Sequence, residues 1–375
     1  MPSQSSSSRL CAPPPPLFLE QGRRRRLFPA GRLPATALLQ LLVFLLLFPA
    51  GHQQLSMPRE RQQQPQQQQP QEQQPQPPQQ QQKQLQQRQR RPWQTFNVVD
   101  FGATGTGHSF DTGAVRAAAA ALAQNGGGTL LFPQGGVYLT GAFNVSSHAH
   151  ILIEPSATVV GSPRGEDWPL LDAATVWPWF GHGSDCDPGT EACRLMHQAL
   201  IFAWNTENVT ISGGGMINCN SSLHTWWGCA QNLSHAPCSG YARPHCVMLT
   251  NSTRIEVSNL TIKNAPDWTL HFAGVRDLVV HHVNVSNPPH MPNADGIDID
   301  ACSNVLVEDC HLQVADDALC VKSGIDWFGR TFGHPTENVL FRRCTIDSGE
   351  GLTIGSEMSA GVRNVRALPL FCSIV

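Results

Sequence analysis

The nine residues RIEVSNLTI (Arg254–Ile262) show the pattern that decides the fold: two short apolar clusters separated by a polar pair. The pattern returns in three later runs: DLVVHHVNV (Asp277–Val285), NVLVEDCHL (Asn304–Leu312) and NVLFRRCTI (Asn338–Ile346). Corresponding positions are separated by 23, 27 and 34 residues, and they are Ile255, Leu278, Val305 and Val339. Recurrence of one short unit with variable insertions predicts a solenoid, in which each repeat buries its apolar side chains against the next.

The repeats select one kind of solenoid. The runs are too short for helices and alternate with a period of two, and the strict leucine pattern of leucine-rich repeats is absent. A parallel β-helix remains. The one strong helix signal is TGAVRAAAAALAQ (Thr112–Gln124), which follows a predicted strand and Gly-rich turn, NVVDFGATGTG (97–107). Because a solenoid exposes apolar surface at its ends, we expect this helix to cap the N-terminal end.

Composition agrees with a turn-rich β protein and excludes one class of partner. The chain has 375 residues with 32 glycines and 29 prolines. Its formal net charge is −3, so a nucleic acid partner is not expected.

The first 92 residues differ from the rest. A basic run (Arg23–Arg26) precedes the apolar stretch Ala35–Phe48, which is typical of a signal peptide or, if uncleaved, a type II signal-anchor. We therefore predict a signal peptide or anchor over 1–51, a disordered Gln/Pro-rich linker over 52–92 and the β-helix domain over 93–375. The protein is expected to enter the secretory pathway, with membrane contact only if the anchor is retained.

Sequons and cysteines also favour the secretory route. Seven N-x-S/T sequons occur, at Asn144, Asn208, Asn220, Asn232, Asn251, Asn259 and Asn284. Two groups of cysteines lie in loops where disulfides would help, namely Cys186 with Cys193, and Cys219, Cys229, Cys238 and Cys246. Four others lie in strand-like runs and are expected to be buried in the core: Cys302, Cys310, Cys320 and Cys344. No metal site built from thiolates is expected.

The stretch NADGIDIDACSNVLVEDCHLQVADDALCVKSG (Asn293–Gly324) gathers seven acidic residues. Asp295 lies 21 residues before Asp316, close to one coil, so it is expected beside the Asp316–Asp317 pair. Three carboxylates in one place raise at least one pKa, which suits glycosidic bond cleavage. A Ca²⁺ site is the alternative. The remaining acids are interpreted as turn or solvated rim residues, and they are Asp298, Asp300, Glu308 and Asp309.

Three motifs carry a family resemblance. NADGIDID, ADDALCVKSG and GEGLTIGSEMSAGVRNV resemble the N-T-D-G, G-D-D and G-H-G…I-G-S motifs of the polygalacturonases, family 28 of the glycoside hydrolases. The likeness covers roughly 96–365. It implies a right-handed parallel β-helix that hydrolyses α-1,4 bonds of polygalacturonan, an acidic cell-wall polysaccharide (pectin), with inversion. No cofactor or metal is expected, and the protein is expected to be a monomer.

The resemblance also implies roles for individual residues. Asp316 would be the general acid, and Asp295 and Asp317 would hold and deprotonate the attacking water, with acid and base about 6.5–9.5 Å apart. Asn293 would orient the cleft. Lys322 would offer positive charge to an anionic sugar, or it could be a rim residue.

The chain departs from the family pattern in four places. Ala294 and Ala315 replace the Thr and Gly of the first two motifs. The family His falls on Glu350, or on Gly349 in a variant alignment; Glu350 would then face the substrate, or simply turn outward. The chain also ends at RALPLFCSIV (Arg366–Val375) without an Arg-x-Lys motif, so we expect a C-terminally incomplete domain with weak or lost activity.

Two alternative functions stay open at this point. One is a non-catalytic cell-wall polysaccharide-binding protein of the same fold. The other is a Ca²⁺-dependent pectate lyase on a similar solenoid.

Overall fold

The computed structural model describes residues 92–181, 194–230, 232 and 234–372. The predicted leader (1–51), the linker up to residue 91 and the Cys186/Cys193 pair lie outside these ranges. No helix within the described ranges is both long and apolar enough to cross a membrane.

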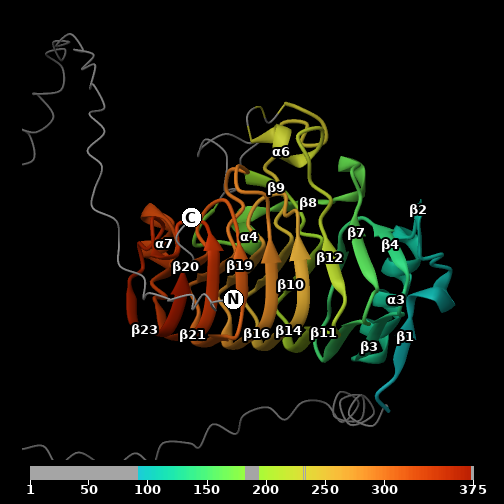
Figure 1. The fold of residues 1–375 in the computed structure, drawn as a ribbon, viewed down its shortest axis with the longest axis horizontal. Helices are drawn as coiled ribbons and strands as arrows, with labels where there is room; N and C mark the ends of the chain where they lie inside the picture. Colours follow the sequence, from blue (N-terminus) through green and yellow to red (C-terminus); the bar gives the residue numbers. More distant parts are fainter. Residues whose placement is uncertain (1–91, 182–193, 231, 233, 373–375) are drawn as a thin grey trace, which may run out of the picture. The chain divides into compact units, whose positions relative to one another are not determined.

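Two long sheets form the molecule, and every strand pair inside them is parallel. Figure 1 shows their strands side by side as successive coils. The first sheet contains β1 (Thr95–Asn97), β2 (Thr106–Phe110), β3 (Gly128–Phe132), β4 (Val137–Thr140), β6 (Ala149–Ile153), β7 (Thr158–Gly161), β11 (Glu207–Ser212), β12 (Met216–Asn218), β14 (Thr253–Lys263), β16 (Arg276–Ser286), β18 (Ser303–Glu308), β19 (His311–Gln313), β21 (Thr336–Ser348) and β23 (Val362–Cys372). The second contains β5 (Phe143–Asn144), β10 (Ile201–Trp204), β13 (Val247–Thr250), β15 (Leu270–Ala273), β17 (Ile297–Asp300), β20 (Leu319–Lys322) and β22 (Leu352–Ile354).

The register in the first sheet is the one that the repeat predicts. Ile255 pairs with Leu278, Leu278 with Val305, and Val305 with Val339. All four side chains are buried in one continuous apolar core. Stacking of equivalent positions from coil to coil therefore confirms the parallel β-helix.

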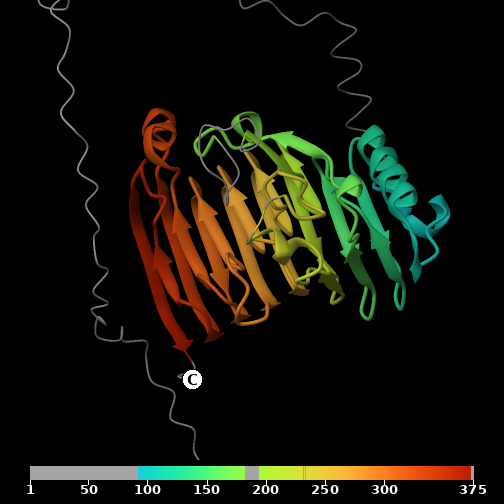
Figure 2. The same ribbon diagram turned by 90° about the horizontal axis from the view of Figure 1, so that it is seen from above.

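Helix α3 (Thr112–Asn125) confirms the predicted cap. Figures 1 and 2 both show it against the N-terminal end of the stack. It ends at Gly126, whose φ of 85° closes the last turn. The segment before it differs from the prediction, because the strand stops at Asn97. The Asn97 side chain accepts a hydrogen bond from the Val99 N–H (3.0 Å) and starts the 3₁₀ helix η1 (Val98–Phe101).

The loops that connect the strands contain short elements. They are η2 (Gly165–Asp167), α4 (Ala173–Val176), α6 (Trp226–Cys229), α7 (Asp326–Phe332) and the antiparallel pair β8 (Leu170–Asp172) and β9 (Leu195–His197). A second apolar cluster, including Trp177, Trp179, Phe180 and Trp268, lies there. Outward-facing side chains of this sheet are therefore buried, which positions the site described below.

The described cysteines behave as predicted. Disulfides join Cys219 to Cys246 and Cys229 to Cys238, and they close the loop that carries α6. The four strand cysteines are free and buried: Cys302, Cys310, Cys320 and Cys344.

Candidate active site

Two neighbouring coils bring three predicted carboxylates together. Asp295 precedes β17, and Asp316 and Asp317 precede β20, its partner in the second sheet. The Gly296 N–H donates to the Asp317 carbonyl oxygen (2.8 Å), which fixes the two turns side by side. One oxygen from each carboxylate lies within 4.8 Å of the other two. The one-coil spacing of the sequence thus becomes a compact acidic cluster, as predicted.

The cluster is tight for an inverting hydrolase. The facing oxygens, at no more than 4.8 Å, are closer than the roughly 6.5–9.5 Å expected between the carboxyl groups of acid and base. Retaining enzymes place these groups at about 5–5.5 Å.

Asn293 holds Asp316 in place. Its backbone N–H donates to Asp316 Oδ2 (3.2 Å), and the Asp317 N–H donates to Asp316 Oδ1 (3.0 Å). The fully buried Arg243 donates to the Asn293 side-chain oxygen (2.8 Å) and to the Pro292 carbonyl oxygen (3.1 Å). The role of Asn293 in orienting the cleft stays a prediction, and the buried contact of its side chain with Arg243 is one that the sequence did not reveal.

Lys322 lies beneath the cluster and is only 4% exposed, so its interpretation as a rim residue is wrong. Its ammonium is 3.9 Å from oxygens of Asp295 and Asp317, and likewise of Asp298. The closest partner is Glu357 Oε2 at 3.0 Å. Burial alone would lower the pKa of Lys322, but Asp298 and the other acids outweigh it and raise that pKa. Lys322 therefore stays charged and supplies the counter-charge of the cluster.

Asp298 is not a turn or rim residue, which corrects the interpretation from sequence. It lies inside β17, fully buried, because the loops cover the outer face of the sheet. Burial raises the pKa of Asp298 well above its ordinary value, and burial together with the Asp298 carboxylate does the same for Asp295. The Lys322 ammonium opposes both shifts. Two adjacent buried acids beside a single cation favour a shared proton over two full charges.

Asp300 is likewise misread from sequence, because it is an internal anchor. Its Oδ2 accepts N–H bonds from Trp177 (2.6 Å) and Trp179 (2.8 Å), and its Oδ1 accepts one from the Gly324 backbone (2.9 Å). Burial raises its pKa to about 6. His271, 3.7 Å away, is neutral because burial lowers its pKa well below the ordinary value.

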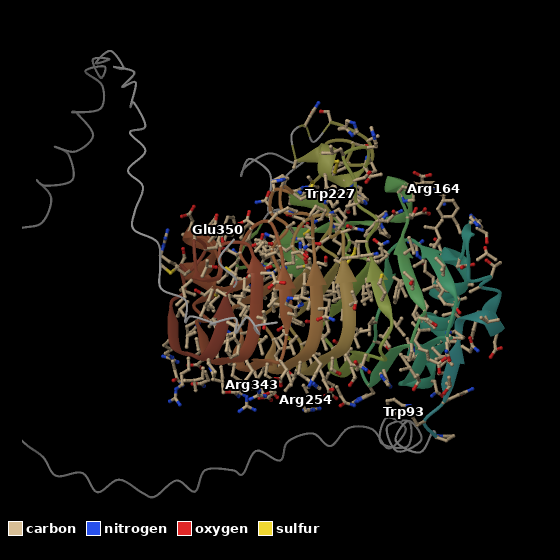
Figure 3. All side chains as sticks on the ribbon, viewed as in Figure 1. Trp93, Arg164, Trp227, Arg254, Arg343 and Glu350 are labelled. Atoms are coloured by element: carbon tan, nitrogen blue, oxygen red, sulfur yellow. A yellow bond between two sulfur atoms is a disulfide. The ribbon has the colours of Figure 1, made fainter. Side chains whose placement is uncertain are left out.

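The other two acids are half-buried and form ion pairs with arginines at the surface, in agreement with the rim interpretation. Glu308 binds Arg342 (2.6 Å) and Arg343 (2.5 Å), and Asp309 binds Arg343 (2.7 Å). Figure 3 shows Arg343 on the opposite side of the solenoid from Glu350.

Glu350 is exposed on the turn that abuts Asp316. Its backbone N–H donates to the Asp316 carbonyl oxygen (2.9 Å). Gly349 has φ of 107°, and a Cβ there would come within 2.5 Å of the same Asp316 oxygen. No residue with a side chain, including the family His, fits at 349 without a shift, so 350 is the position where this turn can present one to solvent.

Comparisons with known proteins agree with this architecture. A model of the glycosyl hydrolases family 28 matches residues 190–369. A probable polygalacturonase of Vitis vinifera is 34% identical over 276 residues, 72% of this chain and 53% of the relative. These matches support membership of this family. Polygalacturonase QRT2 of Arabidopsis thaliana is 25% identical over 264 residues, 70% of this chain and 52% of the relative.

Among solved structures, an exopolygalacturonase from Thermotoga maritima matches with a TM-score of 0.63 and 27% identity, covering 74% of this chain and 66% of that one. The shared fold confirms the right-handed parallel β-helix expected from the resemblance. The chain spans about half the length of the two family 28 relatives from plants.

Proposed function

We propose that this protein hydrolyses α-1,4 glycosidic bonds in the galacturonan of pectin. The observation that carries the proposal is the meeting of Asp295, Asp316 and Asp317, whose oxygens lie within 4.8 Å of one another on two adjacent coils. Paired carboxyl groups, one protonated and one ionised, are what glycosidic hydrolysis requires. The similarity to family 28 supports the same reaction.

The proposed mechanism uses the three carboxylates in separate roles. Asp316, held by two backbone N–H bonds, gives its proton to the leaving glycosidic oxygen as the bond to the anomeric carbon breaks. Asp295 and Asp317 hold a water and take a proton from it, and the water oxygen bonds to that carbon. Asp316 then takes up a proton from solvent, and the proton held by Asp295 and Asp317 is released to solvent. Lys322 keeps the cluster from accumulating unopposed negative charge, and no metal ion or cofactor enters any step.

We also propose that the anomeric configuration inverts, as the family resemblance implies. The close spacing of the carboxylates makes this a separate test. Proton NMR of the first product from a defined oligogalacturonide distinguishes the two outcomes: the β-anomer appears first with inversion and the α-anomer with retention.

The experiment for hydrolysis measures reducing ends and ultraviolet absorbance together on polygalacturonate and pectin. A hydrolase releases reducing ends without an unsaturated product, and chelation of divalent cations does not change the rate. Absorbance that rises with cleavage and disappears with chelator would identify a Ca²⁺-dependent lyase instead. Binding of the polymers with no cleavage of either would identify a wall-binding protein.

We propose that the protein is secreted to the cell wall and acts there as a monomer. Support comes from the leader-like sequence, the seven sequons and the disulfides Cys219–Cys246 and Cys229–Cys238. Recovery from the wall fraction would test the location. A mass that falls on glycosidase treatment would test passage through the secretory pathway, and the mass by light scattering would test the monomer.

A further inference from the structure

We propose that Cys320 is a positioning residue for the reaction, because its thiol orients the Asp317 carboxylate toward the attacking water. The proposal rests on the hydrolase function above and adds a residue to it. Cys320 Sγ donates to Asp317 Oδ2 at 3.1 Å. Asp316, the other acid of the pair, is instead held by the backbone N–H groups of Asn293 (3.2 Å) and Asp317 (3.0 Å). The two adjacent carboxylates are therefore fixed by different donors, and the thiol holds the one that acts on water.

The strand that carries Cys320 brings its thiol to the site. Cys320 lies in β20 directly opposite Asp298 of β17 in the register of the second sheet. Alternate residues of a strand share a face, so Cys320 and Lys322 point the same way. Both reach Asp317 Oδ2, Cys320 with its thiol at 3.1 Å and Lys322 with its ammonium at 3.9 Å. One carboxylate oxygen thus meets a hydrogen-bond donor and a positive charge from the same strand.

The thiol has one hydrogen and two acceptors within reach. They are Asp317 Oδ2 at 3.1 Å and the Gly355 carbonyl oxygen at 3.2 Å. The Gly355 oxygen also accepts from the Lys322 ammonium (3.4 Å), and the carboxylate is the stronger acceptor because it carries charge. Burial and, after it, the Asp298 carboxylate raise the pKa of Cys320, so the thiol keeps its proton. The hydrogen is therefore directed at Asp317.

Two other free thiols show what a buried cysteine does away from the carboxylate cluster. Cys344 in the first sheet donates to the carbonyl oxygens of Arg342 (3.5 Å) and Val307 (3.9 Å). Cys302 likewise donates to backbone carbonyl oxygens, both at 3.2 Å. Such contacts satisfy a thiol through the backbone, whereas Cys320 contacts a carboxylate of the site. Cys344 is therefore a suitable control position.

The experiment compares kcat and KM on polygalacturonate for wild type, Cys320→Ala and Cys320→Ser. Cys320→Ala removes the donor, and we expect kcat to fall about three- to tenfold, the worth of one hydrogen bond. KM should stay unchanged, because Asp317 holds the water rather than the sugar. Cys320→Ser keeps a hydroxyl donor at the same position and should recover most of the lost rate.

Cys344→Ala and Cys344→Ser make the same two changes at a buried thiol of the first sheet. Both pairs of variants should lose some thermal stability, but the Cys344 variants should keep the kcat of wild type. A purely structural role of Cys320 predicts instead that the two pairs behave alike. Wild-type kcat in Cys320→Ala, or equal rates for Cys320→Ala and Cys320→Ser, would overturn the proposal while leaving hydrolysis intact.

Infrared spectroscopy tests the contact without turnover. The S–H stretching band moves to lower wavenumber as its hydrogen bond strengthens, and the spectrum of wild type minus that of Cys320→Ala isolates the band of this thiol. The same subtraction in an Asp317→Asn background should show the band at higher wavenumber, because an amide oxygen is a weaker acceptor than a carboxylate. In an Asp309→Asn background the band should not move.

The infrared result also separates this proposal from the proposed function. If wild type cleaves no polymer, the hydrolase function fails, and a band that moves in the Asp317→Asn background still supports the orienting contact. A band that stays in place there would contradict the contact, whether or not the protein is a hydrolase.

Discussion

Replacing Lys322 with methionine removes the cation at the centre of the cluster while keeping most of the side-chain volume. The lost ammonium lies 3.0 Å from Glu357 and 3.9 Å from each of Asp295, Asp298 and Asp317. Removing one partner of a buried ion pair costs about 3–5 kcal/mol, because the remaining charges stay buried without compensation. At ~2–4 °C per kcal/mol for a large domain, the melting temperature should fall by about 6–20 °C.

The loss of stability in Lys322→Met should depend on pH. Asp295 and Asp298 have pKa values raised by burial, so their protonated forms stabilise the fold at low pH, and that stability is lost as pH rises through the folded-state values. Lys322 lowers both values, so Lys322→Met raises them further. The deficit of Lys322→Met should therefore be largest in mildly alkaline buffer and shrink toward about pH 4, where both acids are protonated.

Thermal melting followed by circular dichroism at several pH values is the assay. Lys263→Met is the matched control: it removes a cation from the half-buried end of β14, where no ion pair of the described chain includes it, and should change stability by less than about 0.5 kcal/mol. If Lys322→Met melts with wild type at alkaline pH, or its deficit is the same at every pH, Lys322 is not the counter-charge of the cluster.

Three further variants probe the surroundings of the site. Burial and, after it, the Asp298 carboxylate raise the pKa of Asp295. Asp298→Asn removes the second cause, so the acid limb of the pH–rate profile should move to lower pH; an unchanged profile would show that the two acids do not share a proton. Arg243→Gln leaves the Asp267 carboxylate buried without its guanidinium partner and should lower the free energy of unfolding by about 3–5 kcal/mol. Arg243→Lys keeps the charge and should cost less. Equal losses of the two variants in denaturant titrations would argue against a charge-dependent role. Cys219→Ser with Cys246→Ser opens a link between residues 27 apart and should lower the free energy of unfolding by about 2–4 kcal/mol, and equal melting of variant and wild type would contradict this.

The repeat determines much of the fold before any coordinates are known. Ile255, Leu278, Val305 and Val339 pair in the predicted order because only equivalent positions can bury their apolar side chains together in stacked coils. The same arithmetic places Asp295 beside Asp317, since a separation near one coil becomes a distance of one strand spacing.

The repeat does not predict that Asp298 and Asp300 are buried. Asp298 and Asp300 alternate with inward-facing Ile297 and Ile299, so local pattern assigns them to the outer face and to solvent. Their burial comes from Trp177 and its neighbours, which precede them by more than a hundred residues. Periodicity within a strand carries no information about a loop that folds over it.

Glu357 was missed for a related reason. It lies one coil beyond Lys322, in a segment whose only sequence signal is the I-G-S motif, and its role appears only when its carboxylate meets the ammonium at 3.0 Å. Burial by itself would raise the pKa of Glu357, but the Lys322 ammonium outweighs burial and lowers it. A pairing between side chains on successive turns depends on loop lengths that the repeat leaves variable.

Glycosidic hydrolysis by the cluster of Asp295, Asp316 and Asp317 can be tested with a single assay. Release of reducing ends from pectic polymers is compared for wild type, Asp316→Asn and Asp309→Asn, a control that removes an acid from the exposed Arg343 pair on the other side of the solenoid. We predict that Asp316→Asn lowers kcat by about 10²–10⁴ with polymer binding retained, and that Asp309→Asn turns over like wild type. Near-normal turnover by Asp316→Asn would contradict the account.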